Sequence, residues 1–160
     1  MKKTQTRASA MHHMVGFTVG TEEFCLDILK VQEIIRMMEI TKIPNAPDYA
    51  KGVINLRGRV IPVIDFRKRF NLPEALEDVE GSRRIVVVDI NGTTIGLIVD
   101  QVSQVIKLEN ENVSPTPETV KSSGGQCFSG IGRMGDKLII LLDLEEMFGE
   151  GELAWIEEAA

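Results

Sequence analysis

The side chains that could carry chemistry are two cysteines, two histidines and a few acidic residues at the ends of apolar segments. Cys25 and Cys127 lie far apart in the sequence and form neither a metal-ligand spacing nor a disulfide framework. His12 and His13 lie in residues 1–13, a polar and unpatterned segment that we expect to be a disordered tail. Neither histidine is therefore placed to act as a base for a cysteine nucleophile.

Other catalytic patterns are also missing from the sequence. It contains no G-x-x-x-x-G-K-S/T or G-x-G-x-x-G motif, and the glycine-rich segment 130–135 is better explained by turns. The acidic residues at expected strand ends are of the kind that accept backbone or arginine hydrogen bonds; they are Asp65, Asp89, Asp100 and Asp143. We therefore predict a protein that is not an enzyme and binds no cofactor or metal.

Charge and composition narrow the class further. The chain has 160 residues, 24 acidic against 18 basic, and a net charge of -6, which argues against a general nucleic-acid binder. The apolar fraction is 43% and the charged fraction 26%, as in an ordinary globular protein. No apolar run is long enough for a membrane span, and the N-terminus lacks the apolar region of a signal peptide. We expect a cytoplasmic protein without membrane insertion.

Alternating apolar residues predict strands in two blocks. In the first, residues 15–35 predict two strands around a turn at 20–23, then a looser apolar segment. Residues 43–52 predict a loop, and residues 53–66 a hairpin that turns at Arg57-Gly58. Pro62 favours an edge position or a bulge. A short helix or turn and a polar connector follow at 65–78.

The second block begins with the apolar segment 84–90 and turns at Asn91-Gly92, the strongest short hairpin signal. Residues 93–106 continue it, prolines and glycines predict a loop up to about residue 125, and 131–148 close the pattern. Residues 151–160 predict a short C-terminal helix or tail.

The two blocks look like an internal repeat. Shifted by about seventy residues, apolar positions of the first block fall on apolar positions of the second: Val19 on Ile90, Phe24 on Ile95, Leu26 on Leu97, Ile28 on Val99, Val31 on Val102, Ile34 on Val105 and Ile35 on Ile106. Further on the shift grows, Gly52 meets Gly130, and Asp65 meets Asp143. We infer a duplicated unit of some five strands, an all-β fold of two small barrels that must pack together to bury enough surface.

Several segments resemble the chemotaxis coupling (adaptor) protein family. They are DILKVQEI at 27–34, IPNAPDYAKGVINLRGRVIPVIDFRKRF at 43–70, GLIVDQVSQV at 96–105 and GIGRMGDKLIILLDLEEM at 130–147. The resemblance implies two intertwined SH3-like five-stranded β-barrels with short helices within residues 14–150. We expect the first barrel to span roughly 14–66 plus the C-terminal strand, and the second roughly 67–136.

The resemblance also implies two partners, the cytoplasmic tip of a methyl-accepting chemotaxis receptor and the regulatory domain of the chemotaxis histidine kinase, with recruitment to membrane receptor arrays. Val31, Glu33 and Arg57 match the receptor-binding pattern of the family, and Lys51 and Gly52 are expected to shape it. A receptor helix docks through apolar anchors whose register is fixed by charges. The alternatives are a core role for Val31 and a simple surface ion pair between Glu33 and Arg57.

The kinase-binding face is predicted on the segment 84–90, through Arg84, Ile85 and Val87. Consecutive apolar residues need cover on both strand faces, so one face could contact the kinase, or both could be buried between the barrels. Two other functions stay open. One is a coupling protein of a related chemosensory pathway for surface motility or second messengers, and the other is an SH3-like nucleic-acid-binding module, which the charge and the scarce aromatics disfavour.

Overall fold

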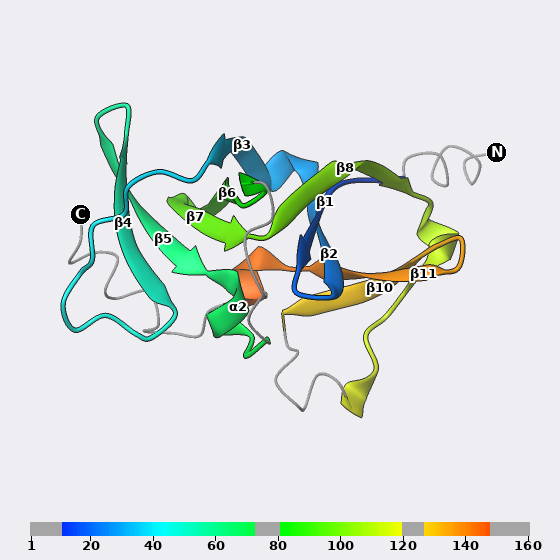
Figure 1. Cartoon of the computed structure of the whole chain (residues 1–160). Helices are drawn as coiled ribbons and strands as arrows, with labels where there is room; N and C mark the ends of the chain where they lie inside the picture. The colour runs from blue at the N-terminus through cyan, green and yellow to red at the C-terminus, as the bar shows by residue number, and fades with distance from the viewer. Residues whose placement is uncertain (1–10, 73–80, 120–126, 148–160) are drawn as a thin grey trace.

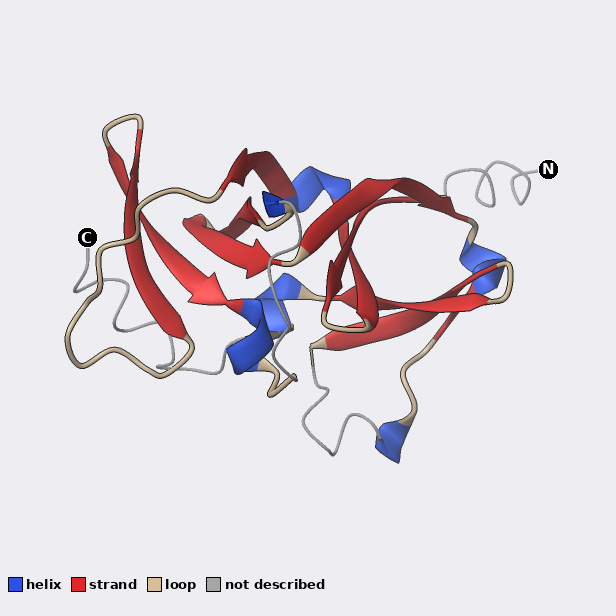
Figure 2. Ribbon diagram, in the orientation of Figure 1, coloured by secondary structure: helices blue, strands red, loops and turns tan. Residues whose placement is uncertain are grey.

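The structure is a computed structural model that describes residues 11–72, 81–119 and 127–147. Within these residues the chain forms strands joined by short helical segments, as Figure 2 shows. The strands are β1 (His12–Val19), β2 (Glu22–Asp27), β3 (Val31–Arg36), β4 (Ala50–Leu56), β5 (Arg59–Asp65), β6 (Arg84–Ile90), β7 (Thr93–Val99), β8 (Gln101–Leu108), β9 (Val113–Ser114), β10 (Phe128–Met134) and β11 (Lys137–Leu142). The helical segments are η1 (Ile28–Lys30), α2 (Phe66–Arg69), η3 (Asn110–Asn112) and η4 (Leu144–Glu146). The all-β prediction is confirmed.

The strands form two sheets that lie side by side, with α2 between them (Figure 1). Sheet A has the order β8-β1-β2-β11-β10-β9, and sheet B has the order β3-β6-β7-β5-β4. Among the described residues, no hydrogen-bonded pair of strands closes either sheet into a ring. The duplication is visible in this order, because β8, β1, β2, β11 and β10 of sheet A correspond to β3, β6, β7, β5 and β4 of sheet B.

The strands of the two halves are exchanged between the sheets, so sheet A and sheet B do not coincide with the residue ranges expected for the two barrels. Only β1 and β2 of the first block lie in sheet A, and β3, β4 and β5 pair with strands of the second block in sheet B. The reason is the shortness of the crossovers. Both edges of β2 are already paired, one with β1 and the other with β11, so β3 cannot pair with β2. The three residues of η1 lead the chain into the other sheet, where β3 pairs with β6. Asp100 alone separates β7 from β8, which crosses to β1 in the same way.

The two hairpins that end the halves repeat each other in detail. Strands β4 and β10 show the same alternation of exposed and buried residues, and each pair has a register shift at its start. Asp65 and Asp143 follow these hairpins and cap the next helical turn, since each carboxylate accepts a hydrogen bond from the backbone N–H two residues on, at 3.0 and 3.1 Å. Pro62 lies in an interior strand, but it precedes the stretch of β5 that pairs with β7, which begins at Val63. A missing N–H therefore costs no ladder bond there.

Three apolar clusters stabilise this arrangement. The largest lies between the sheets and takes residues from both, including the ring contacts of Phe17, Phe24 and Phe66. A second cluster packs against sheet A around Cys25 and Leu108, and a third packs against sheet B. Six strands thus contribute buried residues both to their own sheet's cluster and to the shared one; they are β1, β2, β5, β6, β7 and β11.

Several sequence expectations can be checked at this level. Cys25 is fully buried, and Cys127 is buried as well. His12 and His13 belong to β1, because that strand begins before the expected end of the tail. Strand β4 begins at Ala50, inside the expected loop. The end of the expected loop, up to about residue 125, and the expected C-terminal helix or tail lie outside the described residues. In the described part of the chain, no helix has both the length and the apolar character to cross a membrane.

Candidate functional site

Strand β3 carries the first part of the predicted receptor site. It is an edge strand of sheet B that pairs only with β6, and its register shifts between Val31 and Glu33. The side chain of Val31 is half-buried and packs against the shared core. Glu33 keeps a third of its side chain exposed. The edge position leaves the backbone of this strand open to a partner on one side.

The turn between β4 and β5 carries the second part. Arg57 and Gly58 both have positive φ angles, 52° and 86°, as a two-residue type I′ turn requires. The side-chain oxygen of Asn55 accepts a hydrogen bond from the N–H of Gly58 at 2.9 Å, which fixes the turn. Asparagine suits the first turn position, and a left-handed conformation costs most other residues about 1 kcal/mol. Arginine is therefore a poor choice for the fold at this position.

A salt bridge joins the two parts of the site. The Nη2 atom of Arg57 donates to Oε2 of Glu33, with 68% of the arginine side chain and 33% of the glutamate exposed. An ion pair so exposed contributes little to stability. Because most of the arginine side chain is exposed, its remaining guanidinium donors are accessible to a partner's carboxylate or helix carbonyl.

Lys51 and Gly52 lie on β4, the edge strand at the opposite side of sheet B, and have different roles. The side chain of Lys51 is exposed. Gly52 is buried at a φ of 141°, and a Cβ atom there would lie only 2.0 Å from the carbonyl oxygen of Thr41. Thr41 and Val53 exchange two backbone hydrogen bonds of 2.8 Å, so only glycine lets the connector after β3 approach β4. Gly52 thus shapes the backbone beside the predicted site.

The predicted kinase face is corrected by the burial of β6. Ile85 and Val87 are 0% and 1% exposed and belong to the cluster of sheet B, while Val86 and Val88 fill the shared core. The uninterrupted apolar pattern comes from this double burial and not from a partner. Arg84 stays partly exposed, and its Nη1 donates to the carbonyl oxygens of Gly81 and Arg83 at 2.7 and 2.8 Å.

The sequence reading missed two groups of residues. Met37 and Met38 follow β3 and are exposed apolar side chains. The sequence feature that could have revealed them is the run of apolar residues that continues beyond the charged residues of the strand. The second group surrounds Asp100, whose carboxylate accepts from Arg67 at 2.5 and 2.6 Å and from the N–H of Gly20 at 2.6 Å. This network ties a crossover between the sheets to α2, and its partners are too distant in sequence for a spacing argument.

A cavity of about 330 Å³ opens in sheet A, away from the predicted receptor site. Its floor is apolar, and its rim holds a salt bridge of 2.6 Å between Lys30 and Glu145. The hydrogen bond and the charge of the partner raise the pKa of Lys30 and lower the pKa of Glu145. His12 also lines the cavity, and its Nε2 atom lies 3.1 Å from the side-chain oxygen of Asn110. Across the described residues, no group of three or more His, Cys, Asp or Glu side chains could hold a metal ion.

Comparison with known proteins agrees with this geometry. A family model described as a CheW-like domain matches residues 13–152. The chain is 38% identical to the chemotaxis protein CheW of Klebsiella aerogenes, over 90% of this chain and 86% of that protein. It is 33% identical to the chemotaxis protein CheW of Helicobacter pylori, over 83% of this chain and 79% of that protein.

A solved structure gives the same result for the fold. The scaffolding protein TtCheW of Thermoanaerobacter tengcongensis superposes with a TM-score of 0.77 at 36% identity, covering 88% of this chain and 94% of that chain. The match spans both sheets. From the family match, the identities and the shared fold, this chain belongs to the CheW-like domain family.

Proposed function

We propose that this chain is a chemotaxis adaptor that links the cytoplasmic tip of a chemoreceptor to the regulatory domain of the chemotaxis histidine kinase. It acts in the cytoplasm, is recruited to membrane receptor arrays, and catalyses no reaction of its own. The observation that carries the proposal is Arg57, an arginine in a strained turn where the fold favours asparagine, held by Glu33 and largely exposed. Strain of this kind is retained where a side chain is needed for binding.

The receptor site in this proposal joins β3 to the β4–β5 hairpin. Glu33 and Arg57 supply the charges that set the register of a receptor helix, and Lys51 adds a charge on β4, the strand that leads into the turn of Arg57. Val31 lies on the same strand as Glu33 but is half-buried, so it supports the surface more than it contacts the receptor.

The kinase site in this proposal keeps Arg84, the one residue of the three predicted there whose side chain reaches the surface. We expect Arg84→Glu to weaken binding of the kinase regulatory domain and to leave receptor binding unchanged. Equal kinase binding by this variant and the wild type would move the kinase site elsewhere on the chain.

The central experiment separates the two partners. Wild type, Arg57→Glu and Arg57→Lys are titrated by calorimetry against a two-helix receptor-tip fragment and, separately, against the kinase regulatory domain. We expect Arg57→Glu to weaken receptor binding by about 2 kcal/mol and to leave kinase binding intact. Arg57→Lys should be intermediate, because lysine keeps the charge and loses the planar fork.

Arg133→Glu provides the matched control, since it makes the same charge change on an exposed residue of the β10–β11 hairpin. A second measurement addresses the adaptor role itself. The purified chain should change kinase autophosphorylation only when receptor is present, and it should hydrolyse no nucleotide alone. Receptor binding that is equal in Arg57→Glu and Arg133→Glu contradicts the site.

A further inference from the structure

Three apolar side chains are exposed together at the end of β3. Ile34 is 40% exposed, and Met37 and Met38 are each 36% exposed. They lie close in sequence to the receptor residues Val31 and Glu33. The connector that follows them packs against β4, where Gly52 leaves room for it. Figure 1 shows this connector running from β3 past the β4–β5 hairpin, so the segment that carries the three residues leads from one part of the proposed receptor site to the other.

The other half of the molecule shows that the fold does not require this group. The repeat places Val105, Leu108 and Glu109 at the corresponding positions. Val105 is exposed as Ile34 is, but Leu108 is 2% exposed and fills the cluster of sheet A, and Glu109 is charged. The same backbone layout therefore forms with the first methionine position buried and the second one charged. The methionine pair is specific to the half that carries the proposed receptor site.

Methionine is suited to contact a helix. Its unbranched, polarizable side chain adapts to irregular surfaces, and it is enriched where one protein surface accepts several helices. Val31, by contrast, already packs against the shared core and has little surface left to bury. Burial of the exposed parts of Ile34, Met37 and Met38 supplies apolar contact that Val31 cannot.

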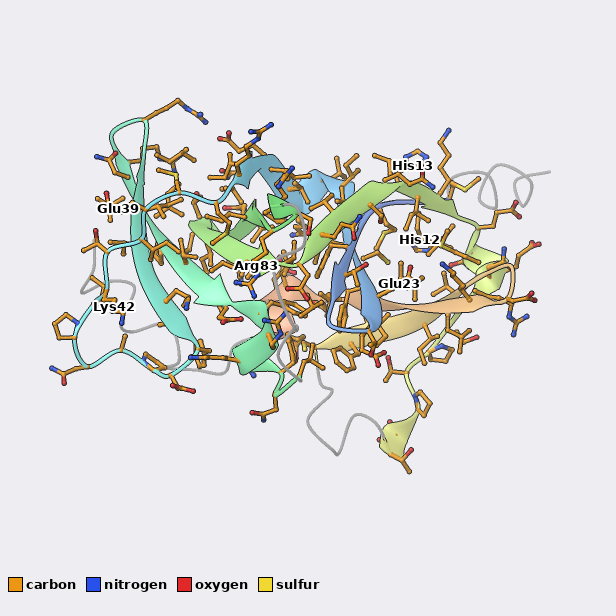
Figure 3. The ribbon with its side chains drawn as sticks, in the orientation of Figure 1. His12, His13, Glu23, Glu39, Lys42 and Arg83 are labelled. Atoms are coloured by element: carbon orange, nitrogen blue, oxygen red, sulfur yellow. The ribbon has the colours of Figure 1, made fainter. Side chains whose placement is uncertain are left out.

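The surroundings of these side chains are basic. Residues 33–59 hold five basic and three acidic residues, although the whole chain has a net charge of -6. The basic side chains are all exposed; they are Arg36, Lys42, Lys51, Arg57 and Arg59. Glu39 and Lys42 project from the connector on the side of the hairpin (Figure 3). An apolar group with a basic rim complements a helix whose apolar stripe has acidic flanks.

We propose that Ile34, Met37 and Met38 are the apolar anchors of the receptor site, and that they select receptor helices with acidic side chains flanking the apolar stripe. This inference rests on the proposed function and adds to it the anchors and the charge of the preferred receptor. The basic rim steers the receptor, and the methionines adapt to its apolar face. Receptors that lack acidic flanks bind this chain more weakly.

The test titrates a two-helix receptor-tip fragment with acidic flanks against wild type, the double variant Met37→Gln/Met38→Gln, and Leu138→Gln. Glutamine keeps the length of methionine and removes its apolar end. Leu138 is the matched control, because it is 63% exposed on the other half's hairpin. Thermal unfolding of each variant checks that its fold is intact, as expected for exposed positions. We expect the double variant to bind about tenfold more weakly and Leu138→Gln to bind like wild type.

A second arm tests the charge. The acidic flanking residues of the fragment are changed to their amides, and the wild-type titration is repeated at about 50 mM and about 300 mM salt. We expect weaker binding of the amide fragment and a smaller salt dependence. Equal binding by the double variant and the wild type overturns the anchors, and equal binding of both fragments overturns the acidic preference. A wild type that binds no receptor fragment overturns the proposed function itself.

Discussion

The two halves of the chain form the same five-stranded layout, but the two positions that form an ion pair between the third strand and the hairpin turn of the first half are uncharged in the second half. The positions of Glu33 and Arg57 correspond to Gln104 and Gly135 in the second half. Gly135 adopts its positive φ of 63° without strain, whereas Arg57 does so at a cost. The second half thus shows that the fold forms without charged residues at these two positions. The ion pair of the first half is therefore not required for the fold.

A second comparison concerns the two crossovers between the sheets. Each is tied by an ion pair to the helical turn that follows a hairpin, but with opposite polarity. Lys30 of the first crossover meets Glu145, and both side chains are at least 30% exposed. Asp100 of the second crossover meets Arg67, with 19% and 8% exposed. Each crossover is therefore held by an ion pair, one at the surface and one largely buried. Removing one partner of the buried pair lowers the unfolding free energy far more than removing one partner of the exposed pair.

Gly52→Ala is expected to have the largest effect on stability. A Cβ atom would meet the Thr41 carbonyl and would force a φ of 141° on an L side chain, so we expect a loss of about 3 kcal/mol or more in the free energy of unfolding. Gly58→Ala is the matched control, because its Cβ would meet nothing within 4 Å, and it should cost about 1 kcal/mol.

Gly130→Ala sharpens this comparison in the other half. Gly130 corresponds to Gly52, and its Cβ would lie 2.9 Å from the carbonyl oxygen of Ser114, but no positive φ is required there. In urea unfolding, we expect the loss of unfolding free energy to be largest for Gly52→Ala, smaller for Gly130→Ala and smallest for Gly58→Ala. A loss at Gly52 no greater than at Gly58 would contradict the close approach of the connector to β4.

Asp100→Asn should lower the unfolding free energy by about 3 kcal/mol, because it leaves the buried guanidinium of Arg67 without its counter-charge. Glu145→Gln, the corresponding change at the exposed crossover, should cost much less. The two variants are compared by chemical unfolding near pH 7. Equal losses would show that burial does not distinguish the crossovers.

The pH dependence gives an independent check on the exposed pair. The hydrogen bond from Lys30 lowers the pKa of Glu145, so the carboxylate stabilises the fold at pH values above its ordinary pKa of 4.5. That contribution is lost as the pH falls through the lower pKa of the folded state. The difference in unfolding free energy between wild type and Glu145→Gln should therefore shrink in acid, and a difference that grows there would contradict the pairing.

The cysteines are expected to have smaller effects. Burial raises the pKa of the Cys25 thiol from 9.0 to about 12 and that of Cys127 to about 11, so both stay protonated in the folded chain. Stability should fall as the pH rises above about 9, because the unfolded state then releases these protons first. A thiol reagent at pH 8 should label neither residue before unfolding, and early labelling of Cys25 would contradict its burial.

Much of the fold follows from the sequence because its signals are local. Alternation located the strands, Asn91-Gly92 located a hairpin turn that has φ angles of 49° and 87°, and the repeat gave the correspondence of the halves. The exchange of strands between the sheets did not follow from the sequence, because it depends on which edges are already occupied, and that is a property of the assembled sheets. Ile85 and Val87 were assigned to a kinase-binding face for the same reason. A strand buried on both faces has the same continuous apolar sequence as a strand with one face open to a partner protein.

The candidate site shows the same division between local and non-local information. Arg57 could be placed in a turn from its glycine neighbour, and its ion pair with Glu33 was one of the alternatives, but only the structure shows that these residues, 24 positions apart, do pair. Met37 and Met38 look like core residues in sequence, and only their exposure distinguishes them. Resemblance to a family supplied the residues of the site, and geometry supplied their separate roles.

The smallest predicted change, and the sharpest test of the comparison between the halves, is Arg57→Asn. Asparagine adopts the positive φ of this turn more readily than arginine, so we expect the unfolding free energy to rise by about 0.5 kcal/mol despite the loss of an exposed ion pair. Receptor binding should weaken at the same time, because the guanidinium is gone. Asn91→Arg makes the reverse change in the other type I′ turn, and it should lower stability by about 1 kcal/mol without affecting the receptor. Urea unfolding and receptor titration of the two variants give the answer together: a less stable Arg57→Asn, or one that binds receptor like wild type, would mean that this arginine serves the fold and not the partner.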